Sequence, residues 1–213
     1  MQGLTIGEKD TYRDFGLRML SCTVSPPEPK IEEIDIPGRD VPLDVSDFFG
    51  EILYKPRTLT AVFDIEARSL QSFLHKFREI CNDMHGLTKK IVLDSEPTHY
   101  YEGRVKVSYA KKNAIFYEVT LSASVAPYKM KLEETKVAFK VSEQLEIRLN
   151  NERKSVIPDI VSDEEFRLVF GKTSAVVPAG AHKVLDLKLT QGANAITCYG
   201  TGNITFIYQE GSL

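Results

Sequence analysis

The sequence predicts a mainly β protein with one helix, divided near residue 130 into two domains. Residues 69–85 carry the only sustained helical spacing of apolar side chains, whereas most other segments alternate apolar and polar residues as half-buried strands do. Beyond residue 130 the strand signals shorten and turn signals recur about every 8–12 residues, which is typical of a β-sandwich. The chain of 213 residues is 42% hydrophobic and 27% charged, enough to bury a core in each part.

A charged, proline-containing stretch over residues 34–57 stands out in the N-terminal half. It opens as a strand that stops at Pro37-Gly38, because Pro fixes φ and Gly tolerates positive φ. Arg39-Asp40 places opposite charges beside that turn, and the chain returns through Tyr54-Lys55-Pro56-Arg57. We interpret the stretch as an excursion from a packed hairpin, the kind of element that a protein offers to a copy of itself.

The predicted helix covers a sheet. It runs from Ser69, a suitable N-cap, to about His85, with Gly86 as the residue that stops it. Its apolar side chains follow the i, i+3, i+4, i+7 pattern of one buried stripe: Leu70, Phe73, Leu74, Phe77, Ile80, Cys81 and Met84. Strands are predicted on both sides of the helix, over residues 58–65, 90–93, 100–109 and 115–125.

Eight short strands are predicted in the C-terminal half, over residues 135–141, 144–149, 156–161, 165–170, 173–177, 183–189, 193–199 and 203–208. Gly200-Thr201-Gly202 is interpreted as the hairpin turn between the last two. Pro158 is expected to confine its strand to a sheet edge, because Pro donates no hydrogen bond to a ladder.

Composition excludes several classes of function. The net charge of −3 and the pI of 5.9 give no basic field for nucleic acid, so DNA binding is not expected as the main role. Three cysteines without short spacing indicate reduced thiols rather than a disulfide scaffold or a zinc site. The N-terminus lacks a signal-peptide pattern, and no apolar run reaches the roughly 20 residues that span a bilayer. We therefore expect folding in a cytoplasm.

No motif with catalytic or ligand chemistry satisfies its requirements. Phe170-Gly171-Lys172-Thr173 lacks the first glycine and the following helix of a phosphate-binding loop. Cys81 and His85 lie one helical turn apart, but two ligands do not make a metal site. The acidic runs Glu133-Glu134 and Asp163-Glu164-Glu165 are expected to be solvated charges beside turns. The sequence thus predicts no enzyme, no cofactor and no metal.

A lectin-like adhesin is the alternative from a different class. Small β-sandwiches bind sugars by stacking an aromatic ring on the pyranose face, most often that of Trp, and this chain has no Trp. Tyr199 and Tyr208 lie in predicted strands, so we expect them to pack rather than to be displayed.

The motifs taken in order resemble a known family. In the N-terminal half they are Pro37-Gly38-Arg39-Asp40, Leu43-Asp44-Val45, Gly50, Tyr54-Lys55-Pro56-Arg57-Thr58 and Ala126-Pro127-Tyr128. In the C-terminal half they are Gly192-Ala193-Asn194-Ala195-Ile196, Gly200-Thr201-Gly202-Asn203-Ile204-Thr205-Phe206 and Glu210-Gly211-Ser212-Leu213. Together they resemble the distal tail protein (Dit) family of long, non-contractile-tailed bacteriophages (siphoviruses) and related prophages, over nearly the whole chain.

The resemblance implies a β-barrel-like, ring-forming N-terminal domain with a covering helix over residues 1–130, and a galectin-like β-sandwich over residues 131–213. It implies a virion structural protein, usually a hexameric ring, in the baseplate at the tail tip. Such a ring joins the tail tube protein to the tail-associated protein and is the hub for receptor-binding or baseplate proteins. DNA passes through the lumen only, no membrane is involved, and assembly takes place in the host bacterial cytoplasm. Longer members insert carbohydrate-binding modules, for which this chain has no room.

A ring subunit needs two different complementary surfaces, because its contacts are heterologous and close by rotation. The candidate subunit interface is the excursion, with Arg39, Asp40, Tyr54, Lys55 and Arg57 as its residues; the charged ones would set register through charge pairing. An ion pair of Arg39 with a carboxylate of its own turn is the alternative, since such surface pairs are common and weak.

Overall fold

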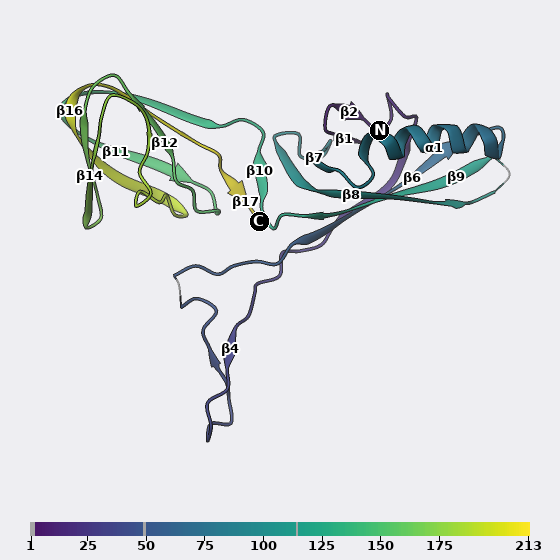
Figure 1. Ribbon diagram of the computed structural model, residues 1–213, viewed down its shortest axis with the longest axis horizontal. Coiled ribbons are helices and arrows are strands. Elements are labelled where there is room, and N and C mark those ends of the chain that lie inside the picture. The colour runs from purple at the N-terminus through teal and green to yellow at the C-terminus, as the bar shows by residue number, and fades with distance from the viewer. Residues whose placement is uncertain (1–2, 49, 114) are drawn as a thin grey trace. The chain divides into compact units, whose positions relative to one another are not determined.

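The computed structural model describes residues 3–48, 50–113 and 115–213. They form two compact units, one ending at Lys129 and the other spanning Met130–Leu213 (Figure 1). Each unit has its own hydrophobic core.

The N-terminal unit is an open antiparallel sheet, half of a barrel, with the strand order β2-β1-β7-β8-β9-β6-β3. Its strands are β1 (Leu4–Ile6), β2 (Lys9–Asp10), β3 (Arg18–Val24), β6 (Arg57–Glu66), β7 (Thr88–Leu93), β8 (His99–Lys111) and β9 (Phe116–Val125). The four strands predicted around the helix correspond to β6 to β9. The longest ladders, β6 with β9 and β8 with β9, form the middle of the sheet.

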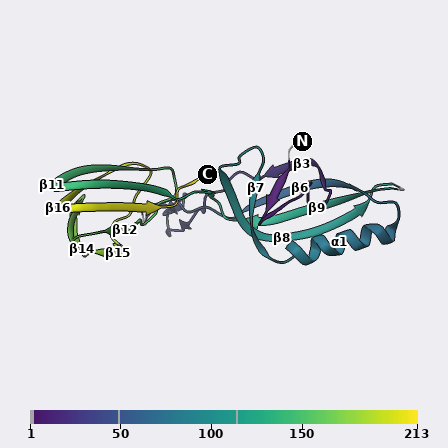
Figure 2. The same cartoon turned by 90° about the horizontal axis from the view of Figure 1, so that it is seen from above.

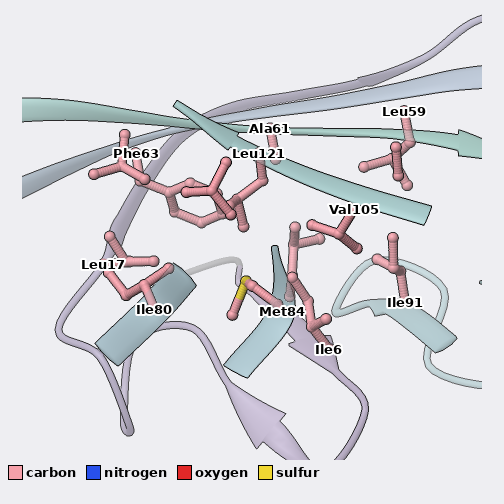
Figure 3. Packing of buried hydrophobic residues seen from close by; sticks show 14 of the residues in the cluster. Ile6, Leu17, Leu59, Ala61, Phe63, Ile80, Met84, Ile91, Val105 and Leu121 are labelled. Carbon is pink, nitrogen blue, oxygen red and sulfur yellow. The ribbon is translucent and has the colours of Figure 1, made fainter. Parts of the chain in front are cut away.

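Helix α1 (Leu70–Met84) covers one face of this sheet and confirms the predicted helix. The Ser69 hydroxyl accepts a hydrogen bond from the backbone N–H of Ser72, as an N-cap does, and Gly86 has φ +79° just after the C-cap. Phe73 stacks on Tyr117 of β9 with the ring centroids 4.0 Å apart. Figure 3 shows Ile80 and Met84 among strand side chains such as Val105 and Leu121, so this part of the predicted stripe completes the core. Leu70 and Leu74, predicted on the same stripe, are exposed.

Between β3 and β6 the chain makes a long hairpin, which we call the arm (residues 25–56; Figure 1). It contains two short paired strands, β4 (Glu33–Ile34) and β5 (Leu43–Asp44).

The C-terminal unit is built on one long ladder. Strand β11 (Thr135–Asn151) pairs with β16 (Gly192–Tyr208) over the full length of both (Figure 2). On the other side of β16, β13 pairs with its first half and β12 with its second half. The remaining strands of this sheet are β12 (Asp159–Ser162), β13 (Phe166–Phe170), β14 (Thr173–Val177) and β15 (Gly180–Lys183). Two short strands outside it, β10 (Lys129–Lys131) and β17 (Gly211–Ser212), pair with each other.

The predicted hairpin at Gly200-Thr201-Gly202 is wrong, because residues 192–208 form a single strand. Gly200 and Gly202 have φ of +145° and +151°, and Glu143, directly opposite Gly200, has φ +71°. Backbone in these regions bends a strand without reversing it. The bend carries β16 and β11 from one layer of the sandwich into the other, so each pair of short predicted strands is one long strand.

Two further expectations in this unit are wrong. Pro158 does not make its strand an edge, because β12 begins one residue later and lies between β16 and β15. The predicted strand 183–189 is largely absent; Gly180 starts β15, which ends at Lys183. Pro158 comes just before β12, so its missing N–H interrupts no ladder hydrogen bond.

An ion cluster joins the two ends of the C-terminal unit. Lys131 Nζ lies 2.7 Å from Glu210 Oε1 and 3.2 Å from Glu152 Oε1. The Thr135 hydroxyl donates to the same Glu210 oxygen at 2.6 Å. Burial alone would raise the pKa of the Glu210 carboxyl, but the hydrogen bonds from Lys131 and Thr135 outweigh it and lower that pKa.

The bend can be tested with Gly200→Ala. A Cβ there would lie 2.8 Å from Phe166 Cδ1 and 2.9 Å from the Glu165 carbonyl oxygen. Together with the unfavourable φ, this should lower the unfolding free energy of the C-terminal unit by about 3 kcal/mol in calorimetry or urea unfolding. Gly171→Ala is the control: its φ is +55° with open space around it, so a loss of about 1 kcal/mol is expected. Equal losses would contradict the steric account.

The ion cluster should make this unit sensitive to acid. Because the folded pKa of Glu210 lies below the unfolded value of about 4.3, its stabilisation is complete above that pH and is lost as pH falls through the folded pKa. Glu210→Gln should cost about 2 kcal/mol at pH 7 and flatten the fall in Tm between about pH 5 and pH 3. Glu164→Gln, at an exposed position, should leave the pH profile of Tm unchanged.

Candidate subunit interface

The described residues of the arm are exposed or half-buried. No described residue between 25 and 56 is buried. Its own hydrogen bonds order it: the Lys30 N–H donates to the Leu53 carbonyl at 2.7 Å, and the Val45 N–H donates to the Glu32 carbonyl at 2.8 Å. The arm is therefore a hairpin that keeps its structure without covering a core.

Arg57 holds the base of the arm. The residue is only 8% exposed. Its Nε donates to the Ser25 carbonyl at 2.6 Å, and a terminal nitrogen lies 3.5 Å from the Pro127 carbonyl. The guanidinium also lies 5.4 Å from the ring centroid of Tyr101. The Arg57 guanidinium therefore has its interaction partners within its own chain. Arg57 is therefore a buried residue at the base of the arm.

Tyr54 and Lys55 also lie at the base. Tyr54 forms a β-bridge with Pro29, and its ring meets the ring of Tyr128 edge-on at 5.9 Å. The Lys55 N–H donates to the Glu28 carbonyl at 2.8 Å, and its ammonium lies 3.5 Å from the Glu28 carboxylate. Both side chains of that ion pair are well exposed, so it contributes little to stability. The two residues close the hairpin at its root.

Arg39 and Asp40 lie at the far turn. The Arg39 N–H donates to the Ile36 carbonyl at 3.1 Å, and Gly38 has φ +85°. Both charged side chains are exposed, and within the described part of the chain no carboxylate lies at ion-pair distance from Arg39. The structure thus separates the five predicted residues into a base, Tyr54, Lys55 and Arg57, and a tip, Arg39 and Asp40. Arg57 is buried, whereas the charges of Arg39, Asp40 and Lys55 are exposed.

The sequence interpretation missed the apolar side chains of the arm. Val41 is 72% exposed and Leu53 is 57% exposed. On β4 and β5, Ile34 pairs directly with Leu43, so both lie on one face of the hairpin. Other exposed apolar residues of the arm are Ile31 and Ile52. The arm therefore exposes several apolar side chains on one ordered element.

Hydrogen bonds within the arm stabilise the turn that follows β5. The Ser46 hydroxyl and N–H both donate to one Asp44 oxygen, and these bonds lower the pKa of the Asp44 carboxyl. The Ser46 hydroxyl oxygen accepts from the Glu32 N–H at 2.8 Å. The Asp44 carboxylate thus accepts hydrogen bonds within the arm, and it is ionised near neutral pH.

Residues considered above as candidates for catalysis or ligand binding make structural contacts. His85 Nδ1 accepts a hydrogen bond from the Val107 N–H at 3.0 Å, which ties the end of α1 to β8. Gly171-Lys172 is the turn between β13 and β14. The described residues contain no group of three or more metal-ligating side chains, and no described helix is long and apolar enough to span a membrane. The three cysteines are free, and burial raises the pKa of Cys198 to about 12.

The two tyrosines weighed for sugar binding differ. Tyr208 is buried as expected, and its hydroxyl donates to the Asn150 carbonyl. Tyr199 is 39% exposed, so the expectation that it packs is wrong. The guanidinium of its strand neighbour Arg167 lies 5.7 Å from the ring centroid. That cation occupies a face of the ring on which a sugar would stack.

Removing the buried cation should loosen the arm. Arg57→Met keeps the packing of the aliphatic stem but leaves the Ser25 and Pro127 carbonyls without their donor. We expect a loss of about 2 kcal/mol in urea unfolding and faster proteolytic cleavage within residues 25–56, located by mass spectrometry. Arg39→Met, at the exposed tip, is the matched control and should change neither quantity. Identical cleavage rates for both variants would rule out Arg57 as the clamp.

No protein-family model and no curated protein matches the chain. A solved structure does: the SPP1 Dit protein (gp 19.1), described as a paradigm of the hub adsorption apparatus in phages that infect Gram-positive bacteria. The match covers 100% of both chains with a TM-score of 0.73 and 14% sequence identity. The chain therefore has the Dit fold, and the predicted β class with one helix is confirmed.

Proposed function

We propose that this chain is a Dit-family hub protein of a phage tail tip, and that it forms a closed ring of six subunits. The observation that carries the proposal is the fold shared with a phage hub protein from end to end, with neither unit missing or replaced. At this level of identity the fold alone is shared, so the role in this chain rests on its own surfaces.

The arm supports the ring. A cyclic assembly needs a heterologous contact in which one surface of a subunit meets a different surface of the next. The arm offers exposed apolar side chains for affinity and the Arg39–Asp40 pair for register. An isolated subunit would leave this apolar surface in water, whereas a ring would bury it.

Within the tail, the ring would join the tail tube protein to the tail-associated protein and would carry the receptor-binding or baseplate proteins. DNA would pass through its lumen. The net charge of −3 is compatible with passage, because a strongly basic lining would bind phosphates. The location that follows is the virion tail tip, after assembly in the host cytoplasm.

The mass of the purified protein in solution tests the ring. Six chains of 24.0 kDa give about 144 kDa by light scattering or native mass spectrometry. Ile34→Asp combined with Val41→Asp should reduce this species to single chains, since it puts charge into the buried contact. Val176→Asp is the control, since Val176 is similarly exposed but belongs to the other unit. A wild-type protein that stays at 24.0 kDa at every concentration would contradict the proposal.

A further inference from the structure

Strand β14 of the C-terminal unit has one side unpaired. It is the first strand in the order β14-β13-β16-β12-β15, and among the described strands it pairs only with β13. Its five residues, Thr173-Ser174-Ala175-Val176-Val177, include no charged one, and its ladder with β13 has no register shift. Thr173, Ser174 and Val176 are exposed. Strand β14 is therefore an open, regular edge onto which another strand can be added.

The other terminal strands that are longer than two residues carry charged side chains. Arg18 lies on β3, Lys136 on β11 and Lys183 on β15, and β3 also contains a bulge. Charges and bulges at sheet edges prevent strands of different molecules from pairing. Among the strands of this length that the structure describes, β14 is the terminal strand that lacks both.

The turn between β13 and β14 determines which backbone groups of β14 are free. The turn has two residues, so the pair Phe170–Thr173 that flanks it is hydrogen-bonded. Because hydrogen-bonded pairs alternate with non-hydrogen-bonded ones, the next residue of β14 that bonds to β13 is Ala175. Ser174 and Val176 therefore direct their N–H and C=O groups away from β13, toward the open side.

These free groups are symmetric about Ala175. When a second β14 runs antiparallel with its Ala175 opposite the first, Ser174 of each copy meets Val176 of the other. Both of these pairs exchange two hydrogen bonds, and all the residues of the strand have a partner. The central Ala175 pair is of the non-hydrogen-bonded kind, in which the Cα atoms approach to about 4.5 Å, so a small side chain fits there. No charged residue faces another within this register.

We propose that β14 pairs with β14 of a second copy across a two-fold axis at Ala175, which joins two C-terminal units into one continuous sheet. A second copy is the occupant because the free groups, the length and the uncharged sequence of β14 all match their own two-fold image. Neighbouring subunits of a six-membered ring are not related by a two-fold axis. The contact is therefore separate from the ring contact, would link chains of different rings, and does not depend on the arm.

A single cysteine at the axis tests the pairing and its register. In a chain with Cys22→Ser, Cys81→Ser and Cys198→Ala, Ala175→Cys would place two thiols on opposite residues, within the span of about 4.4–6.8 Å between Cα atoms that a disulfide allows. In a glutathione redox buffer we expect a dimer of about 48 kDa on a non-reducing denaturing gel. Ser174→Cys is the matched control. Its two copies would lie diagonally, about 7–8 Å apart or more, so this more exposed cysteine should give no dimer.

A proline variant tests the hydrogen bonds across the axis. Ser174→Pro, added to the Ala175→Cys chain, removes the N–H that faces the partner but no bond to β13, because Ser174 is at a non-hydrogen-bonded position of that ladder. The amount of disulfide dimer should fall about tenfold or more. Ser174→Thr keeps the N–H and should keep the dimer. Circular dichroism and thermal unfolding would show that each chain remains folded.

The outcomes separate this contact from the ring. A dimer of the Ala175→Cys chain that is absent for Ser174→Cys and lost with Ser174→Pro supports the pairing, whether or not the wild-type chain forms the 144 kDa species. No dimer of the Ala175→Cys chain at any protein concentration overturns the pairing and leaves the hub function standing. Equal dimer from both cysteine chains, or a dimer that persists with Ser174→Pro, overturns it as well, because neither result requires paired strands.

Discussion

The buried guanidinium of Arg57 is the interaction on which the presentation of the arm depends. A cation enclosed in protein must be compensated, and here carbonyl oxygens and an aromatic face provide that compensation instead of a carboxylate. The partners are Ser25 at the start of the arm, Tyr101 of β8 and Pro127, which follows β9. One side chain therefore ties a hairpin without a core of its own to a sheet that has one.

The two units solve the problem of unpaired strand edges in different ways. In the N-terminal unit, the edge strand β3 carries a bulge and borders a hollow lined by both polar and apolar residues. In the C-terminal unit, the long strand β11 presents a series of charged residues, including Lys136, Lys140 and Arg148. Charged edges discourage association, whereas an apolar edge invites it.

Local signals in the sequence were sufficient for α1 and for β6 to β9. The helix has its cap residue, its apolar stripe and its stop between Ser69 and Gly86, and the long strands alternate clearly. The bend in β16 could not be predicted in the same way, because a glycine pair signals a hairpin and a bend equally well. What decides between them is the packing of Phe166 against Gly200, a contact between residues distant in sequence.

The candidate site was predicted only in part, for a physical reason. The stretch was identified by its turn and its charges, and the tip pair Arg39–Asp40 is indeed exposed. Arg57 was named as a candidate interface residue for its charge, and no sequence pattern shows the carbonyl oxygens that surround it in the fold. Ile34 and Val41 are apolar residues in the sequence, but the sequence alone does not show whether such residues are exposed or buried in a core.

The ladder between β11 and β16 determines how the C-terminal unit would respond to a pulling force. Its first pair, Thr135 with Tyr208, lies beside the Lys131–Glu210 ion pair, so the two chain ends of the unit leave from the same end of an antiparallel ladder. Tension between those ends would open the ladder one pair at a time, like a zipper, instead of loading all its hydrogen bonds together. The ion cluster is the first barrier to such opening, and the bend at Gly200 is where the second layer would begin to separate.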